Sequence, residues 1–285
     1  MTPATRQAVQ PAGGTRLPRE HPEPLGRPVG EFRGAPVIVL APAFGGGIAL
    51  GSLLGRHPGL ASTSGSGLLP LCDQAMATWR SVEGRADRPP SQLAVTATRV
   101  LATSVITAVL ARAGKRRWCE VAAASPQAAE TFLGLFPGTR FLCLHRACPG
   151  LIRAALDASP WGTAHPAFVP YTRAYPVSAA AALTAYWVEH ARNLLAFERA
   201  HPQECLRLRF EDLTGARHQT AERIEAFLGL DPLIHGLAMP DDDSQQPPSA
   251  GPRQEANLPV DLIPPNLLAQ ANELLRQLDY PALPE

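Results

Sequence analysis

The stretch APVIVLAPAFGGGIAL, residues 35–50, decides the fold of this chain. A continuous apolar run is followed by three glycines and then by a second apolar segment, which predicts a buried strand, a tight turn and a helix. In α/β proteins this order places the unpaired N–H groups of a helix N-terminus at a strand end, where they bind phosphate or sulfate. We therefore expect Gly45, Gly46, Gly47 and Ile48 to bind an anion, unless the glycines serve only the backbone angles of the turn.

A second strand is predicted at Arg140–Leu144, and it is followed by His145 and Arg146. A guanidinium at a strand end offers forked hydrogen bonds to a phosphate group. The alternative for Arg146 is an ion pair with a carboxylate such as Glu120 or Glu211. The glycine turn and Arg146 are thus two candidate phosphate-binding elements at two strand ends. Together they indicate a nucleotide that carries phosphates at separate positions.

Nothing in the chain matches the GxxxxGK[ST] pattern of a Walker A loop. The first loop therefore lacks the lysine and the hydroxyl that hold Mg-ATP, which argues against an NTPase.

Apolar strands alternate with helices along the chain, which predicts an α/β fold with three α/β/α layers around a central parallel sheet. The other predicted strands are Trp118–Val121 and Cys205–Phe210. The predicted helices are Ile48–Arg56, Leu68–Arg80, Leu93–Ala113, Pro126–Phe136, Pro149–Ala158, Pro176–His201, Glu211–Leu228 and Leu262–Leu278. Of these, Leu93–Ala113 is expected to be mostly buried. The segment Ser62–Gly67 is expected to be a flexible stretch and Lys115–Arg117 a solvated turn.

Composition divides the 285 residues into four parts. Residues 1–34 are expected to be a disordered leader without the apolar run of a signal peptide, and residues 35–240 the α/β domain. Residues 241–260 are expected to be a proline-rich linker, and residues 261–285 a C-terminal helix that packs on the domain. The oligomeric state is left open.

Charge and cysteine content narrow the possible partners. The net charge is +1, so neither nucleic acid nor a membrane is an expected partner. The five cysteines are scattered without the spacing of metal ligands, so no metal is expected. An odd number of cysteines without a secretory signal favours reduced thiols and a cytoplasmic location.

Residues 35–231 resemble the bacterial sulfotransferases that use 3'-phosphoadenosine 5'-phosphosulfate (PAPS) as sulfuryl donor. The resemblance lies in the ordered segments PVIVLAPAFGGGIALGSLLGRHPGL, WCEVAAASPQAAETFLGLFPGTRFLCLHRACPGLIRAAL, the helix around Trp187, and CLRLRFEDLTGARHQTAERIEAFLGLD. It implies a P-loop-like sulfotransferase fold and transfer of a sulfuryl group to a hydroxyl or amine of a small molecule.

The resemblance also implies roles for individual residues. The turn Gly45–Ile48 would face the 5'-phosphosulfate of the donor, and Arg146 its 3'-phosphate. Arg253 would fold over the donor as part of a C-terminal loop, or it would be a solvated linker arginine.

The chain departs from the family at its donor loop. Where the family carries a basic residue and hydroxyl residues, this chain has Ala43, Phe44 and the three glycines. Ala154 stands where the family places a serine, and Ser64–Gly67 stands where many members have a glutamate base. The alternative function is therefore a catalytically impaired sulfotransferase-fold protein that binds a nucleotide or acts as a scaffold.

The catalytic base is unassigned, and the two candidates are Glu120 and His57. The simpler expectations are an ion pair for Glu120 and a structural turn for His57. His145 is expected to be a satisfied histidine at a strand end, and His190 a core histidine.

Overall fold

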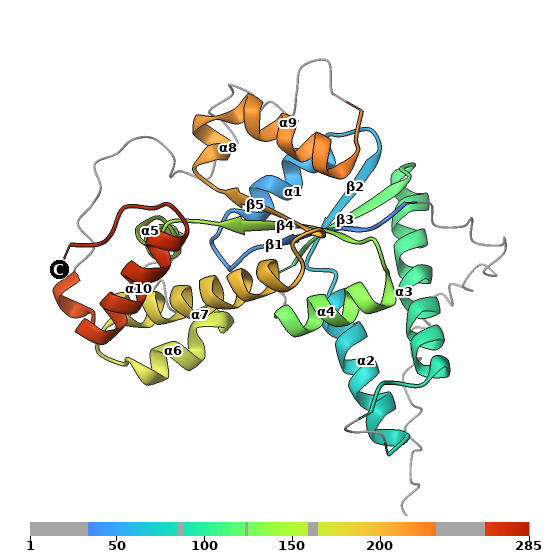
Figure 1. Ribbon diagram of the computed structural model, residues 1–285, viewed down its shortest axis with the longest axis horizontal. Coiled ribbons are helices and arrows are strands. Elements are labelled where there is room, and N and C mark those ends of the chain that lie inside the picture. Colours follow the sequence, from blue (N-terminus) through green and yellow to red (C-terminus); the bar gives the residue numbers. More distant parts are fainter. Residues whose placement is uncertain (1–33, 85–87, 123–124, 159–164, 232–259, 285) are drawn as a thin grey trace, which may run out of the picture.

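A computed structural model describes residues 34–84, 88–122, 125–158, 165–231 and 260–284. Its centre is one sheet of five parallel strands in the order β2-β3-β1-β4-β5 (Figure 1). The strands are β1 (Val37–Leu40), β2 (Leu60–Ser64), β3 (Arg117–Ala122), β4 (Arg140–His145) and β5 (Cys205–Arg209). Helices cover both faces, so the predicted three-layer α/β/α fold is confirmed.

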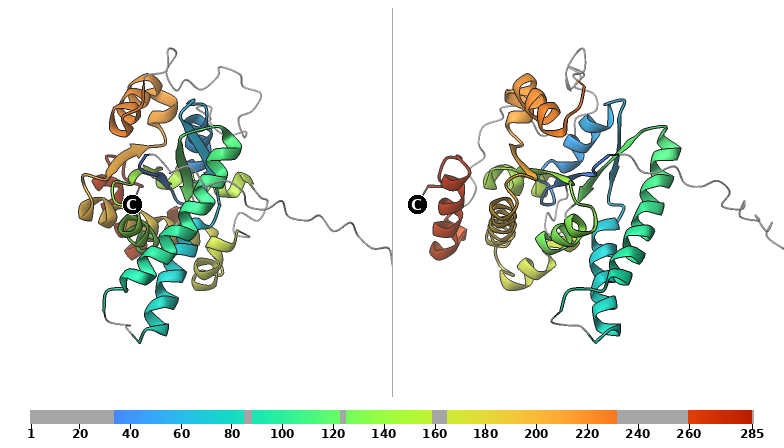
Figure 2. Two further views of the ribbon diagram at one scale, coloured as in Figure 1. Left: turned by 90° about the vertical axis from the view of Figure 1, so that its right-hand side faces the viewer. Right: turned by 45° about the vertical axis from the view of Figure 1, so that its right-hand side comes forward.

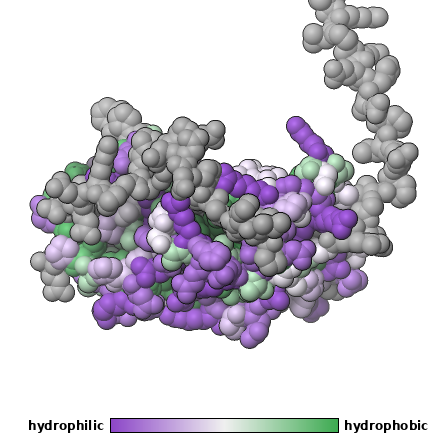
Figure 3. Space-filling model, turned by 90° about the horizontal axis from the view of Figure 1, so that it is seen from above, coloured by the Kyte–Doolittle hydropathy of each residue, from purple (hydrophilic) through white to green (hydrophobic). Residues whose placement is uncertain are grey.

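Alternate side chains of each strand supply the two faces of the sheet with apolar groups. Val37 and Val39 of β1 pack into the layer drawn above the sheet in Figure 1, whereas Ile38 and Leu40 pack into the layer below it. The upper layer is made of α1 (Gly47–Gly55), α8 (Asp212–Gly215) and α9 (Arg217–Leu228). Its outer surface, seen from above in Figure 3, is mostly hydrophilic where it is coloured.

The lower layer is larger and has two apolar clusters. One contains helices α2 (Leu68–Val82), α3 (Gln92–Ala113), α4 (Pro126–Leu135) and the C-terminal half of α7 (Ala179–Ala200). The other contains the N-terminal half of α7 with α5 (Cys148–Ala158), η1 (Pro166–Phe168), α6 (Val169–Ala174), η2 (Val260–Leu262) and α10 (Pro265–Gln277). In this second cluster α10 lies against α7 through Leu267, Leu274 and Leu275.

The strand order puts the topological switch point of the sheet, which is where open α/β sheets have their ligand crevice, between β1 and β4. These two strands are neighbours, with Leu40 level with Cys143, so the loops that follow them lie side by side. After β1 the chain enters α1 in the upper layer, whereas after β4 it enters α5 in the lower layer. Ligands of open parallel sheets bind where consecutive connections leave in opposite directions. The crevice therefore contains the glycine turn and Arg146.

One strand was missed by the prediction. The segment expected to be flexible begins inside β2, whose residues Leu60–Ser64 pair in parallel with Arg117–Val121. Leu60 and Ala61 are buried, but the serines and the threonine after them interrupt the run of apolar residues that would predict a strand. Pairing with β3 holds this edge strand in place, which a local sequence pattern does not reveal.

Two further expectations are corrected. Helix α3 forms as predicted, but it is not mostly buried: its outer side exposes Leu93 and Val100. The segment Lys115–Arg117 is a solvated turn only in part: Arg116 is exposed, but the Lys115 ammonium donates to the carbonyl oxygens of Gly55 and His57. Arg117 lies in β3 and donates to the carbonyl oxygens of Ala35 and Leu228. The side chains of Lys115 and Arg117 therefore hold neighbouring loops in place at the amino-terminal edge of the sheet.

Parts of the predicted organisation lie outside the described residues. They are the leader up to residue 33, nearly all of the proline-rich linker, and Arg253.

Candidate functional site at the carboxyl edge of the sheet

The glycine turn ends β1 and begins α1. The Gly45 N–H donates to the Pro42 carbonyl oxygen at 2.9 Å, and Gly46 adopts a left-handed φ of 93° at the N-cap of α1. No side chain in the described ranges caps this helix. The N–H groups of Gly47 and Ile48 lie in the first turn of α1, where the helix itself supplies no acceptor for them. Neither N–H group has a hydrogen-bond partner among the described residues. This helix N-terminus therefore keeps unpaired donors.

Close packing, as much as backbone angle, requires the three glycines. A Cβ atom on Gly46 would lie 2.0 Å from Cδ2 of Phe210. A Cβ atom on Gly45 would lie 2.8 Å from Cγ of Pro42, and one on Gly47 would lie 2.9 Å from Cβ of Ala41. Only Gly46 of the three has a positive φ. The turn is thus compressed between its own strand and the ring of Phe210.

Ala43 and Phe44 turn toward the lower helical layer. The Ala43 N–H donates to the Tyr186 hydroxyl oxygen at 2.7 Å, and burial raises the pKa of Tyr186 to about 12. Phe44 has a φ of 62° and stacks on Phe168, with ring centroids 5.6 Å apart. The place of the family's basic and hydroxyl residues is thus taken by apolar groups packed against α7.

Arg146 reaches the glycine turn directly. Its Nη1 donates to the Phe44 carbonyl oxygen at 2.9 Å, and its guanidinium carbon lies 4.2 Å from the centroid of the Phe210 ring. Its Nε is buried and has no hydrogen-bond partner among the described residues. Burial lowers the pKa of Arg146, and the nearby carboxylate of Glu211 opposes that shift. The structure therefore brings Arg146 and the turn together, as the sequence predicted.

Glu211 neighbours Arg146 but is used by other groups. Its Oε1 accepts the Ala147 N–H at 3.0 Å, and its Oε2 accepts the Tyr280 hydroxyl at 2.7 Å. The carbonyl of Arg146 accepts the indole N–H of Trp187 at 2.8 Å. In the described part of the chain, no carboxylate lies within ion-pair distance of the Arg146 guanidinium. The expected alternative of an ion pair is not found there.

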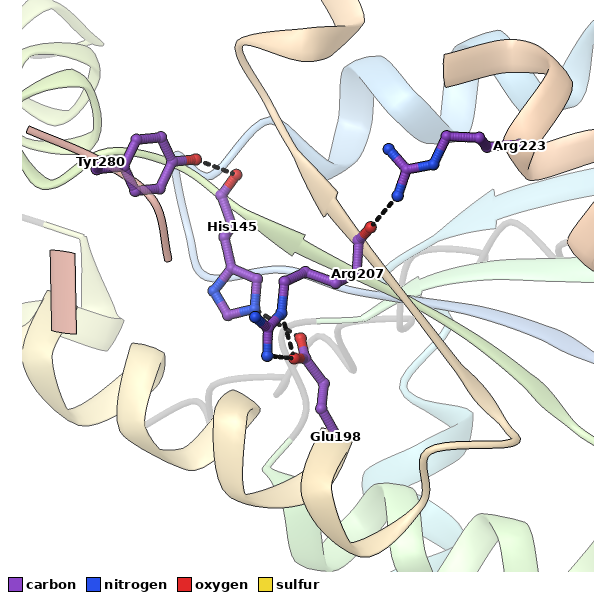
Figure 4. A network of polar contacts seen from close by, with 5 residues as sticks. All are labelled: His145, Glu198, Arg207, Arg223 and Tyr280. Carbon is purple, nitrogen blue, oxygen red and sulfur yellow. Dashed lines mark hydrogen bonds and ion pairs between the residues drawn. The ribbon is translucent and has the colours of Figure 1, made fainter. Parts of the chain in front are cut away.

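Next to this edge, a polar network joins the buried side chains of His145 and Glu198 to the exposed side chain of Arg207 (Figure 4). The His145 ring nitrogen Nε2 lies 2.7 Å from Oε1 of Glu198 on α7, and Arg207 on β5 donates to the other oxygen at 2.6 Å. The Tyr280 hydroxyl also donates to the His145 carbonyl oxygen at 3.3 Å. His145 is thus a satisfied strand-end histidine, as predicted, and the network fixes the end of β4 from which Arg146 projects.

Glu120 lies near the same edge, but its carboxylate is already engaged. It is buried, accepts the Ser66 N–H at 2.7 Å, and accepts the Thr63 hydroxyl through its other oxygen. Both partners lie in or just after β2. In this structure Glu120 holds the end of β2 against β3 rather than facing the glycine turn.

His57 lies at the opposite, amino-terminal edge of the sheet, three residues before β2. Its Nδ1 accepts the Gly59 N–H at 3.0 Å, and its Nε2 lies 3.2 Å from the carbonyl oxygen of Asp231. The structure therefore does not bring His57 together with the glycine turn or Arg146. Its contacts are those of a structural turn.

Sequence reasoning missed the aromatic residues of the site. Phe210 and Tyr186 contact the turn, although they follow it by more than a hundred positions. The signal for Phe210 was its place at the end of a strand, the same signal that identified Arg146. Tyr186 lies within the predicted helix Pro176–His201, and only packing shows that its hydroxyl meets the loop.

His190 lies one turn beyond Tyr186 on α7. Its Nδ1 lies 3.0 Å from the Tyr186 carbonyl oxygen, so Nδ1 carries the proton and Nε2 keeps a free lone pair. Its ring centroid lies 4.0 Å from that of Tyr186, and burial lowers its pKa. His190 is therefore a neutral imidazole at neutral pH.

Comparisons with known proteins agree with this architecture. A family model described as the sulfotransferase family matches residues 37–233, which is more than half of the chain. No curated protein sequence gives a match.

Three solved structures are similar in fold. The sulfotransferase domain from the curacin biosynthetic pathway has 17% identity and a TM-score of 0.55, covering 88% of this chain and 99% of that one. The sulfotransferase domain from the Synechococcus PCC 7002 olefin synthase has 17% identity and a TM-score of 0.52, covering 87% and 96%. Sulfotransferase STF9 from Mycobacterium avium has 12% identity and a TM-score of 0.53, covering 91% and 79%.

Proposed function

Because this chain belongs to the sulfotransferase family, we propose that it binds PAPS between β1 and β4 and transfers the sulfuryl group to a small molecule. The acceptor group is a hydroxyl or an amine. The observation that carries the proposal is the contact between Arg146 and the Phe44 carbonyl oxygen, which places a guanidinium beside a helix N-terminus with unpaired donors.

The residues present at this edge fit the two anionic ends of such a donor. The N–H groups of Gly47 and Ile48 and the dipole of α1 suit the 5'-phosphosulfate. The buried, unpaired Nε of Arg146 suits the 3'-phosphate. Space beside Nε depends on Gly150, since a Cβ atom there would lie 3.2 Å from Nε.

The reaction forms a bond between the acceptor oxygen or nitrogen and sulfur. The bond between sulfur and the oxygen bridging to the 5'-phosphate breaks, and 3'-phosphoadenosine 5'-phosphate leaves with the electron pair. The acceptor's proton passes to solvent or to a basic group. The protein's share is to position the donor and to stabilise the charge that develops on the leaving phosphate.

A second candidate is a nucleotide-binding protein with impaired catalysis. Ala43 and Phe44 favour it, because they supply neither a cation nor a hydroxyl to the donor loop. Removing one transition-state stabiliser costs about 10²–10³ in rate. On this alternative the protein retains the nucleotide site and acts through binding.

The five cysteines support a cytoplasmic location. All of them are free, and four are buried. Thiols that stay reduced are typical of intracellular proteins.

The decisive experiment measures the melting temperature with and without 3'-phosphoadenosine 5'-phosphate. Ligand at about 100 times its dissociation constant adds about 2.7 kcal/mol, which raises the melting temperature of a domain of this size by about 5–10 °C. Arg146→Ala is expected to abolish the shift. Arg276→Ala, which removes the same charge from an exposed surface pair, is expected to retain it. No shift for the wild-type chain would overturn both candidates.

A transfer assay separates the two candidates. The chain is incubated with PAPS and a panel of phenols, alcohols and amines, and sulfated products are measured by mass spectrometry. Product that disappears in Arg146→Ala supports the enzyme. Ligand-induced stabilisation without product from any acceptor supports the impaired protein.

A further inference from the structure

Helix α3 is the outermost element on one side of the molecule (Figures 1 and 2). It has a mean hydropathy of 1.8, a value typical of membrane-spanning helices, yet only 28% of its apolar stretch is buried. Its inner side packs into the core through Ala94, Ala102, Ile106 and Leu110. A helix that is fixed in the fold in this way does not cross a membrane, so its exposed side needs another explanation.

The exposed side of α3 carries four large aliphatic side chains. Leu93 is 66% exposed, Val100 60%, Leu101 47% and Val105 40%. Soluble monomers rarely leave so many large apolar groups together on one helix, and such surfaces mark interaction sites. Near the tip of the α2–α3 hairpin, Val82 is also exposed. The surface therefore extends from this tip along the helix.

Charge is distributed unevenly around this helix. Residues 88–118 contain no Asp or Glu, and their cations are Arg88, Arg99, Arg112, Lys115, Arg116 and Arg117. Arg88, Arg112 and Arg116 are exposed and flank the aliphatic side chains at the two ends of the helix. The near-neutral net charge of the whole chain does not reveal this local excess of positive charge. Arginines beside an exposed apolar surface are groups that anionic lipid headgroups attract.

We propose that α3 docks this protein on an anionic lipid bilayer, with Leu93, Val100, Leu101 and Val105 inserted among the headgroups and acyl chain ends. Arg88, Arg112 and Arg116 contact the lipid phosphates. The inference is independent of donor binding, because α3 lies away from the crevice between β1 and β4.

Charge argues against two other occupants. In a second copy of this chain, α3 would meet another helix with cations and no acidic residue, so like charges would come together. A nucleic acid would neutralise the arginines but would leave the four aliphatic side chains against phosphates. A lipid surface matches both the apolar and the basic groups.

The test is co-sedimentation of the full chain with vesicles. We expect binding to vesicles of about three parts phosphatidylcholine to one part phosphatidylglycerol, weakened between about 0.1 M and about 0.5 M salt. Arg112→Ala with Arg116→Ala is expected to lower the affinity by about 25-fold, at about fivefold for each cation. Val100→Asp with Val105→Asp is expected to lower it by more than about tenfold, because charged groups replace the inserted ones.

The matched control is Val177→Asp with Leu262→Asp. Both are exposed aliphatic residues away from α3, and the pair changes the net charge by the same amount. This control is expected to bind vesicles as the wild type does. A variant that keeps the shift in melting temperature with 3'-phosphoadenosine 5'-phosphate has a folded domain. If that ligand gives no shift, the folding of each variant is checked by thermal melting followed by circular dichroism.

Three results would overturn the proposal. One is no sedimentation with anionic vesicles at low salt, and another is equal loss in the control pair. The third is a different occupant: a dimer in light scattering that Val100→Asp with Val105→Asp dissociates, or binding to duplex DNA without binding to vesicles.

Discussion

At the scale of single residues, Gly46 shows how one position serves both the fold and the site. Its positive φ lets the chain turn from β1 into α1, and its missing side chain leaves room for Phe210. Phe210 in turn lies beneath the guanidinium of Arg146. The turn, the ring and the arginine therefore form one packed unit, and a change in any of them shifts the others.

Gly46→Ala is expected to lower the free energy of unfolding by about 2–5 kcal/mol. About 1–2 kcal/mol comes from the left-handed backbone and about 1–3 kcal/mol from displacement of the Phe210 ring. Gly84→Ala is the control, because Gly84 also has a positive φ but its added Cβ would meet open space. It should show only the backbone part. Equal losses in the two variants, measured by urea unfolding, would contradict the role of Phe210.

At the scale of elements, α10 completes the apolar cluster around α7. Leu275 is fully buried there, and the segment after α10 returns to the sheet, where the Tyr280 hydroxyl donates to Glu211 and to the His145 carbonyl oxygen. The end of the chain thus supports the residues next to Arg146. We infer that α10 is part of the domain core rather than an appendage.

Leu275→Ala is expected to destabilise the protein by about 2–5 kcal/mol, because it leaves a cavity between α7 and α10. Leu262→Ala serves as the control, since Leu262 is half exposed, and should change stability by less than about 0.5 kcal/mol. Chemical unfolding of both variants gives the comparison. A loss at Leu275 no larger than that at Leu262 would mean that α10 contributes little to folding.

At the scale of the whole molecule, buried ionisable groups make stability depend on pH. Burial lowers the pKa of His190 below its usual value of about 6.5, so the unfolded chain binds a proton more readily than the folded one. The stability that this histidine contributes is therefore full above about pH 6.5 and is lost as the pH falls through its folded pKa.

His190→Gln is expected to remove this contribution to the pH dependence of the free energy of unfolding. The slope that one histidine contributes is at most about 1.4 kcal/mol per pH unit. His218→Gln is the matched control, because His218 is exposed. The measurement is the free energy of unfolding between pH 5 and pH 8 for the three chains. A constant difference between wild type and His190→Gln across that range would refute the prediction.

The sequence alone determined the main architecture and one pair of site residues. Runs of apolar residues indicated β1 and β4, because strands buried on both faces need them. The edge strand β5 was indicated instead by its alternation of leucine and arginine. The glycine turn and Arg146 each follow such a strand, and parallel strands end at a common edge, so their proximity followed from the pattern.

Only the tertiary structure decided which side chains fill the site and which surfaces stay exposed. Phe210, Tyr186 and Glu211 reach the turn and Arg146 through folding that joins distant segments. Likewise, the apolar pattern of α3 does not tell a buried helix from an exposed one. Local patterns record the preference of each residue for water or core, whereas the partners of each residue are set by packing across the whole chain.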